Sequence, residues 1–278
     1  VLKKAGVSRV SIGIQSFQDE ELKAIKRRPR QNTIYQALDD IRQMDFPYFN
    51  IDLIYGIKGQ TVESFLYSLE EALRFQPNEL FIYPLYVRQG TGITEREPDD
   101  VCFRMYRAAC KLLQAKGFLQ TSMRRFIHHP STDAEVSCGD EVMLSCGSGG
   151  RSYLGDLHYA TRYTVCQQCI AREIDEYMAT TDFTVARNGF ILSAKEQQQR
   201  FIIKNLMYYM GIDKAEYTRR FGEPLDRTPL FRQLAEQYWI EETPERIRLT
   251  PEGLGYSDYI GQLFITPEIR QLMETYSY

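Results

Sequence analysis

Long apolar runs are missing from this 278-residue sequence. None approaches the roughly 20 residues that a membrane-spanning helix needs, and the first residues lack the apolar middle of a signal peptide. A strong charge of one sign is missing too, because 34 basic and 37 acidic residues leave a formal net charge of -3. This balance provides no global attraction to nucleic acid or to an anionic membrane. We therefore expect no nucleic-acid partner, no membrane span and a cytoplasmic location.

Cysteine is sparse, and an initiating methionine is absent. The dense cysteine framework of small secreted domains is not found, so we expect reduced thiols. The chain starts at Val1 and reaches a β-branched run within ten residues, so we expect further sequence to precede it. The six cysteines are Cys102, Cys110, Cys138, Cys146, Cys166 and Cys169.

The sequence does contain an alternation of strand-like and helix-like segments. Hydrophobic residues make up 43% of the chain, which is enough for one large domain and an appendage. Periodicity predicts strands at 8–15, 49–55 and 80–87, and helices at 19–26, 33–44, 61–73 and 99–116. Thr61 is expected to cap the third helix, and Gly117 to end the fourth in a left-handed conformation. Strands separated by thirty to forty residues with helices between them indicate parallel βαβ units, and hence an α/β barrel or part of one.

The first two strands have one unusual face. In the first, Ser11, Gly13 and Gln15 alternate with an apolar set formed by Val10, Ile12 and Ile14. The interior of a packed α/β barrel is filled with bulky branched side chains, so a small and polar face indicates space for a ligand.

Asp52 has a similar position in the second strand, between Ile51 and Leu53. Burying a carboxylate is costly unless another group pairs with it, and a polar ligand would be such a group. The alternative is a structural ion pair between Asp52 and a neighbouring Lys or Arg.

The second half is expected to be mostly helical. Residues 139–162 are rich in glycine and predict a loop or strand-turn across the mouth of the barrel. Capping pairs, helix-starting prolines and a hairpin at 238–242 and 246–250 then indicate a small winged-helix-like module. Its acidic side chains argue against tracking nucleic-acid phosphates. The residues behind this interpretation are Ser193, Glu196, Asp213, Glu216, Pro229 and Pro251, with Glu241, Glu242, Glu245 and Glu252 as the acidic set.

Four stretches resemble one enzyme family. Gly-Val-Ser-Arg-Val-Ser-Ile-Gly-Ile-Gln-Ser-Phe-Gln-Asp-Glu-Glu-Leu (6–22) is similar to the fourth-strand signature of the oxygen-independent coproporphyrinogen III oxidases, which are radical S-adenosylmethionine (SAM) enzymes. Asn-Ile-Asp-Leu-Ile-Tyr-Gly-Ile-Lys-Gly-Gln-Thr (50–61) resembles the fifth strand and its turn, with Lys58 where proline is usual. Weaker similarities lie at 146–156 and in Arg-Leu-Thr-Pro-Glu-Gly (248–253).

The resemblance implies an α/β fold: a partial (β/α) radical SAM barrel, from about strand four to six onward, with a helical, winged-helix-like C-terminal domain. It divides the chain at 1–130 (barrel), 131–190 (glycine-rich segment on the substrate side) and 191–278 (C-terminal domain). The family's Cys-x3-Cys-x2-Cys loop, which holds a [4Fe–4S] cluster, has no match among the six cysteines. We therefore expect the cluster ligands and the first strands to lie upstream of Val1.

The resemblance also assigns site residues. Gln15 and Asp52 match positions that hydrogen-bond the ribose of SAM, and Arg27 matches an arginine near its polar groups. Arg28 and Arg30 lie beside Arg27, and a solvated basic cluster would give the same sequence pattern. Tyr86 and Arg151 align with positions near a second SAM or the substrate, but both differ there in residue type.

The implied activity is radical chemistry with SAM and a [4Fe–4S] cluster on a porphyrin-like or other organic substrate, with flavodoxin or ferredoxin as electron donor. The departures at Lys58, Tyr86 and Arg151 favour an oxidase-like paralogue over the oxidase itself. A haem chaperone, a radical SAM methyltransferase and a non-catalytic barrel with a partner-binding winged helix remain as alternatives.

Two other groups of residues are alternative metal ligands. Cys138, Cys146, Cys166 and Cys169 have one Cys-x2-Cys pair among them, but Cys166 and Cys169 lie in a helical pattern where cysteine is usually a small apolar residue. His128 and His129 precede a proline, and a solvated loop is the simpler interpretation of this pair.

Overall fold

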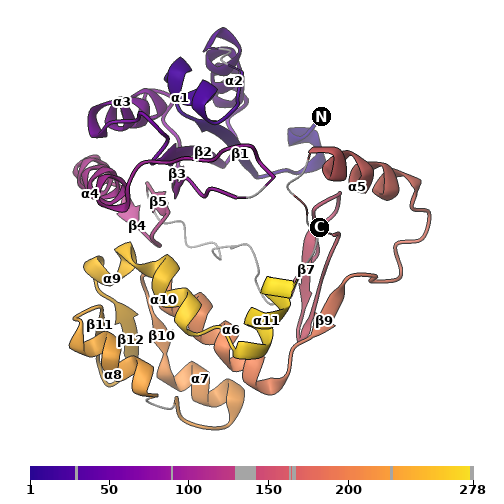
Figure 1. The fold of residues 1–278 in the computed structure, drawn as a ribbon, viewed down its shortest axis with the longest axis vertical. Helices are drawn as coiled ribbons and strands as arrows, with labels where there is room; N and C mark the ends of the chain where they lie inside the picture. Colours follow the sequence, from indigo (N-terminus) through magenta and orange to yellow (C-terminus); the bar gives the residue numbers. More distant parts are fainter. Residues whose placement is uncertain are drawn as a thin grey trace. The chain divides into compact units, whose positions relative to one another are not determined.

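The computed structural model describes residues 1–28, 31–88, 90–128, 142–162, 164, 167–225 and 228–275. The chain forms two compact units, one made mainly of residues 1–131 and the other mainly of residues 132–278 (Figure 1). This boundary lies next to the division expected after residue 130. The further division expected after residue 190 stays a prediction.

The first unit alternates strands and helices in the predicted order. Its elements are η1 (Lys3–Ala5), β1 (Arg9–Gln15), α1 (Asp19–Ala24), α2 (Gln31–Met44), β2 (Tyr48–Tyr55), α3 (Val62–Leu73), β3 (Glu79–Pro84), α4 (Asp99–Ala115), β4 (Leu119–Gln120) and β5 (Arg125–Ile127). Thr61 caps α3 in a reciprocal capping box with Ser64. Gly117 follows α4 with a φ of 84°. Both predicted helix boundaries are confirmed.

The five strands form one mixed sheet in the order β1-β2-β3-β5-β4. β1, β2 and β3 are parallel, as predicted, and β5 runs antiparallel to both of its neighbours. β4 therefore runs in the same direction as β3, and α4 is the crossover between them. The chain then turns at Ser122, and β5 lies between these two strands. The short turn is sufficient because antiparallel neighbours can be joined by a hairpin, whereas parallel neighbours need a long crossover. This inserted antiparallel strand was not predicted.

One face of the sheet is covered by helices. The side chains of Ile51 and Leu53 on β2 and Leu80 and Ile82 on β3 are fully buried. They pack with α3 and α4 side chains such as Phe65 in the main hydrophobic core. The apolar faces predicted for the first two strands are therefore confirmed as the core side.

Substituting Thr61 with alanine is expected to lower the free energy of unfolding by about 0.5–2 kcal/mol, because the Ser64 backbone N–H loses its acceptor. Urea denaturation followed by circular dichroism measures this change. Thr228→Ala is the matched control, since Thr228 precedes α8 (Pro229–Glu236) without a side-chain capping bond. That variant should change stability by no more than about 0.5 kcal/mol. Equal losses in both variants would contradict the role of the cap.

The second unit contains a small antiparallel sheet in the order β6-β7-β8-β9. Its elements are β6 (Val142–Met143), β7 (Arg151–Leu154), β8 (Leu157–Ala160), α5 (Gln167–Ala179) and β9 (Gly189–Ile191). The glycine-rich stretch predicted as a loop or strand-turn thus forms three short strands over 142–160. Residues 139–141 of that prediction lie outside the described part of the chain.

The C-terminal part of this unit has the expected winged-helix-like pattern. Its elements are α6 (Ala194–Leu206), β10 (Ile212–Asp213), α7 (Lys214–Phe221), α8, β11 (Ile240–Glu242), β12 (Arg246–Leu249), α9 (Pro251–Gly255), α10 (Ser257–Leu263) and α11 (Pro267–Thr275). β11 and β12 form the predicted hairpin, and Ser193 and Glu196 form the predicted capping box. Pro229 and Pro251 begin their helices.

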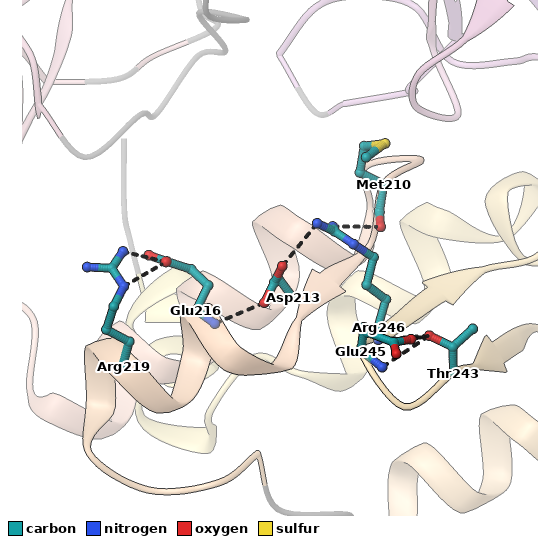
Figure 2. Close-up of polar contacts among 7 residues, drawn as sticks. All are labelled: Met210, Asp213, Glu216, Arg219, Thr243, Glu245 and Arg246. Carbon is teal, nitrogen blue, oxygen red and sulfur yellow. Dashed lines mark hydrogen bonds and ion pairs between the residues drawn. The ribbon is translucent and has the colours of Figure 1, made fainter.

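The second predicted capping box is only half correct. Asp213 accepts the Glu216 backbone N–H at 2.9 Å, but the Glu216 carboxylate pairs with Arg219 instead of returning to the cap (Figure 2). The other Asp213 oxygen accepts from Arg246 of β12 at 3.0 Å, and Arg246 also donates to the Met210 carbonyl at 3.3 Å. Asp213 therefore joins the start of α7 to the neighbouring strand.

Candidate functional site

The face of the large sheet opposite the helices is polar where β1, β2 and β3 are paired. Neighbouring residues in register share a face, and Gly13 is the register partner of Asp52. Asp52 is in turn paired with Phe81 of β3, and Asn50 with Glu79. We call this surface, formed by Gly13, Asn50, Asp52, Glu79 and Phe81 together with the side chains that reach them, the polar face.

Gln15 reaches the polar face through an unusual backbone conformation. The register between β1 and β2 shifts between Gly13 and Gln15, and Gln15 has a φ of 75°. A left-handed conformation is unfavourable for a residue with a Cβ and is found preferentially at functional sites. The amide lies over Gly13, so that a Cβ atom at position 13 would be only 2.3 Å from Gln15 Nε2. Any side chain at position 13 would therefore displace the glutamine amide.

The Gln15 amide has no hydrogen-bond partner within the part of the chain that the structure describes, although the residue is only 8% exposed. Buried polar groups in native proteins are nearly always hydrogen-bonded, so this amide is available to bond with a ligand.

Asp52 lies beside this amide, across the β1–β2 pair. Its Oδ1 accepts from Asn50 Nδ2 at 2.7 Å, and no protein group among the described residues bonds to Oδ2. Burial raises the pKa of the Asp52 carboxyl, nearby Glu79 raises it further, and the Asn50 hydrogen bond opposes them. Asn50 itself is 2% exposed, and its Oδ1 has no partner among the same residues. A desolvated oxygen without a partner, Asn50 Oδ1, thus belongs to the residue that bonds to Asp52.

Arg27 comes to the same place from the turn after α1. Its Nη1 donates to the Gly13 carbonyl at 3.1 Å, and its guanidinium remains exposed. The structure therefore brings Gln15, Arg27 and Asp52 together around Gly13. Arg28 is also exposed, and Arg30 lies outside the described residues.

The weaker candidates belong to other elements. Tyr86 follows β3, is 42% exposed and accepts from Arg124 Nη2 at 2.6 Å. Arg151 is exposed on β7 of the second unit. Lys58, which replaces the usual proline, is exposed with its Nζ 4.0 Å from the carboxylates of Glu95 and Glu97.

Glu21 is a buried carboxylate that the sequence did not single out, although it lies in the acidic start of the first predicted helix. It accepts from Ser16 Oγ at 2.5 Å, from Gln60 Nε2 at 2.8 Å and from Ser64 Oγ at 2.5 Å. Ser16 and Gln60 belong to the two long motifs at 6–22 and 50–61. Hydrogen bonds to Glu21 therefore connect the turn that follows Gln15 with the turn that follows β2.

Replacing Glu21 with glutamine should lower the free energy of unfolding by about 1.5–3 kcal/mol. One carboxylate oxygen that accepts from a hydroxyl would become an NH2 group facing that donor, and hydrogen bonds to charged groups are worth about this much. Guanidinium chloride titration at pH 7 provides the measurement. Glu20→Gln, in the exposed ion pair with Lys23, should be close to neutral. A Glu21→Gln variant as stable as Glu20→Gln would refute this account of the turn.

Glu79 is a second buried carboxylate that sequence reasoning missed, because the third strand was predicted to begin one residue later. Glu79 is 2% exposed and lies between two arginines. Arg9 Nη1 donates to Oε2 at 2.5 Å, and Arg125 of β5 donates to Oε1 from Nε at 3.0 Å and also from Nη2. An ion pair with arginine was the alternative interpretation of Asp52, and on this face it is Glu79 that forms such pairs.

The alternative metal residues gain no support. Cys146 is exposed, Cys169 is half-buried, and Cys138 and Cys166 lie outside the described residues, as does His129. His128 packs edge-on against Phe118 with ring centroids 5.0 Å apart. Within the described ranges, no three His, Cys, Asp or Glu side chains are grouped to hold a metal. No helix in those ranges is long and apolar enough to cross a bilayer.

Comparison with known proteins places the polar face in a family context. Residues 1–72 match the radical SAM superfamily, and residues 192–255 match the HemN C-terminal domain. In both regions the chain resembles the HemN-like radical SAM proteins. The first match contains both long motifs and the three clustered residues Gln15, Arg27 and Asp52.

The HemN-like chain has relatives of two kinds. It is 26% identical over 95% of its length to the "Heme chaperone HemW" of Bacillus subtilis, and it covers 72% of that protein. It is 25% identical over 90% of its length to the "Oxygen-independent coproporphyrinogen III oxidase" of Thermostichus vulcanus, and it covers 83% of it. The solved structure of coproporphyrinogen III oxidase (HemN) from Escherichia coli is similar in fold, with a TM-score of 0.74 at 21% identity. The similarity covers 95% of the present chain and 65% of the solved E. coli chain.

Proposed function

We propose that the polar face binds the ribose of SAM, and that this HemN-like chain serves a radical SAM reaction on a porphyrin-like substrate. One observation carries the proposal. The Gln15 amide and Asp52 Oδ2 lie on neighbouring strands of the polar face, and neither has a hydrogen-bond partner among the described residues. An amide and a carboxylate oxygen suit two vicinal hydroxyls, because the carboxylate accepts while the amide both donates and accepts.

The surrounding residues fit this ligand. Gly13 has no side chain and so leaves room for the Gln15 amide above the strand, and Arg27 is held beside it by the Gly13 carbonyl with its guanidinium still exposed. A guanidinium is suited to a fork with a carboxylate such as that of the methionine part of SAM. Asn50 fixes one Asp52 oxygen, so the other is oriented before the ribose arrives.

Bound together with a reduced [4Fe–4S] cluster, SAM would supply the radical chemistry of the reaction. The chain's contribution in this proposal is to hold the ribose and to orient the nucleoside. The substrate class follows from the relatives, whose names concern coproporphyrinogen III and haem. A flavodoxin- or ferredoxin-type electron donor belongs to the same proposal.

Haem carriage is the second candidate, supported by the B. subtilis chaperone relative, which matches 95% of the chain. Anaerobic reconstitution of the protein separates the two functions. An oxidase-type enzyme cleaves SAM and converts its substrate, whereas a carrier retains haem in a stoichiometric complex without turnover.

A nucleoside series tests ribose binding without requiring any activity. Isothermal titration of the whole chain with adenosine, 2′-deoxyadenosine and 3′-deoxyadenosine compares the same base with one hydroxyl fewer. Each deoxynucleoside is expected to bind about tenfold more weakly than adenosine, which corresponds to the loss of one hydrogen bond with a charged or buried partner. Equal affinity for all three would refute ribose recognition by the polar face.

A further inference from the structure

The small sheet of the second unit has an exposed edge at β9. In the order β6-β7-β8-β9 this strand has one neighbour, β8, which runs antiparallel to it. All of its residues are exposed, Phe190 to 39% and Ile191 to 70%. Edge strands are usually protected by charged side chains, proline or a bulge, and β9 has the uncharged sequence Gly-Phe-Ile in unbroken register with β8. Such an edge is suited to pairing with another strand.

The backbone groups along this edge have no partner. The Leu192 N–H donates to the Asp156 carbonyl of the β7–β8 turn at 2.8 Å, so Leu192 faces β8. Residues that face the neighbouring strand alternate in an antiparallel ladder, so Phe190 also faces β8, and Gly189 and Ile191 direct their N–H and C=O groups outward. These outward groups have no hydrogen-bond partner within the ranges that the structure describes. The edge therefore offers two donors and two acceptors to an added strand.

An apolar row on one face of the sheet ends at the same edge. Val142, Leu154, Leu157 and Ile191 are register partners across the four strands. Val142 is 78% exposed and Leu154 37% exposed, and Leu157 is half-buried. Gly189 lies two positions before Ile191, so it shares this face and leaves it open for a side chain from an adjacent strand. The edge thus combines a protruding aliphatic side chain with a vacant position.

We infer that β9 pairs with β9 of a second copy of the chain, in antiparallel orientation and with the two-fold axis at Phe190. In this register Gly189 lies opposite Ile191 of the second copy, and each N–H donates to the carbonyl of the residue opposite. All the outward backbone groups of both strands are then satisfied. A two-fold interface requires a surface that is complementary to itself, and this edge meets that requirement.

The side chains agree with the same register. Each Ile191 side chain faces a glycine of the second copy instead of another bulky residue, so the apolar row continues across the axis. On the opposite face the two Phe190 rings are directly opposite each other, and cross-strand aromatic pairs stabilise antiparallel strands. Neither strand contributes a charged side chain, so no like charges are brought together.

The first test is the oligomeric state of the whole chain. The paired segment is short, so we expect a weak dimer, which sedimentation velocity at about 5 to 500 µM should detect. Ile191→Lys should weaken dimerisation at least about tenfold, because an aliphatic side chain that is buried twice per dimer is replaced by a charge. Val142→Lys is the matched control, since Val142 is equally exposed in the same row but at the other edge, and it should dimerise like the wild type.

A chain that stays monomeric at about 0.5 mM would overturn the inference and leave the edge to a different occupant. Equal dimerisation of the two lysine variants would overturn it as well. Circular dichroism shows whether both variants are folded, and both substitutions lie at exposed positions.

Cysteine cross-linking tests the register itself. The two Phe190 Cα atoms would be about 4.5 Å apart across the axis, which is within reach of a disulfide, whereas the two Ile191 Cα atoms would be more than about 7 Å apart. Under mild oxidation at about 0.5 mM, Phe190→Cys should form the intermolecular disulfide and Ile191→Cys should not, as read from the linked peptides by mass spectrometry. Equal cross-linking, or more through Ile191→Cys, would contradict the register. The nucleoside series does not depend on this edge, so failure of one proposal leaves the other standing.

Discussion

Replacing Glu79 with alanine is expected to lower the free energy of unfolding by about 3–5 kcal/mol. Glu79 is 2% exposed, and the side chain of its partner Arg125 is 12% exposed. Removing one member of a buried ion pair leaves the other charge desolvated without compensation, which costs far more than the net value of the pair. Denaturant titration at pH 7 measures the loss, and thermal unfolding should show the same order of stability.

Glu241→Ala is the matched control for this prediction. Glu241 also forms a cross-strand ion pair with an arginine, Arg248, but both side chains are about half exposed. Exposed pairs contribute about 0–1 kcal/mol, so this variant should remain close to the wild type. A similar loss in the two variants would mean that burial of Glu79 does not decide its importance.

Replacing Asp52 with asparagine is expected to weaken the binding of SAM by about ten- to hundredfold. The substitution preserves size and retains an oxygen for Asn50 Nδ2, but it removes the charge that would accept the ribose hydroxyl. Hydrogen bonds to charged groups are worth about 1.5–3 kcal/mol, which corresponds to this range of affinity. Equilibrium dialysis with labelled SAM measures the effect.

The same substitution should stabilise the fold at pH 7. The pKa of Asp52 is raised in the folded protein, mainly by burial, so its ionised form is less favourable there than in the unfolded chain. Its contribution to stability is therefore lost as pH rises through the folded pKa. Asp52→Asn removes this penalty. The difference in free energy of unfolding between the variant and the wild type should therefore narrow as pH falls toward the ordinary aspartate pKa of about 3.9.

Asp39→Asn on the exposed side of α2 is the control, and it should change neither property. A loss of stability at pH 7 in Asp52→Asn with unchanged SAM binding would identify Asp52 as a structural residue. Weaker binding in a more stable protein is the combination expected of a residue kept for function.

Much of the first unit could be predicted from local sequence, because its signals are local. The alternation of Val10, Ile12 and Ile14 with small and polar residues gives the two faces of β1, and Thr61 and Gly117 indicate helix ends by themselves. The position of Asp52 between Ile51 and Leu53 likewise predicts a carboxylate on the face away from the helices.

Other features depend on residues far apart in the chain. Glu79 is neutralised by Arg9 and Arg125, which are 70 and 46 positions away, and the insertion of β5 that brings Arg125 there has no local signature. Two of the three donors to Glu21, Gln60 and Ser64, lie 39 and 43 positions away from it. The positive φ of Gln15 could not be predicted either, because only the tertiary context supports that conformation in a residue with a Cβ.

A crystal structure of the protein with S-adenosylhomocysteine tests the central claim most directly, since this ligand has the ribose of SAM and needs no cluster chemistry. We predict both ribose hydroxyls within hydrogen-bonding distance of Asp52 Oδ2 and the Gln15 amide. A ribose bound at any other surface, with those two groups still without a partner, would contradict the account.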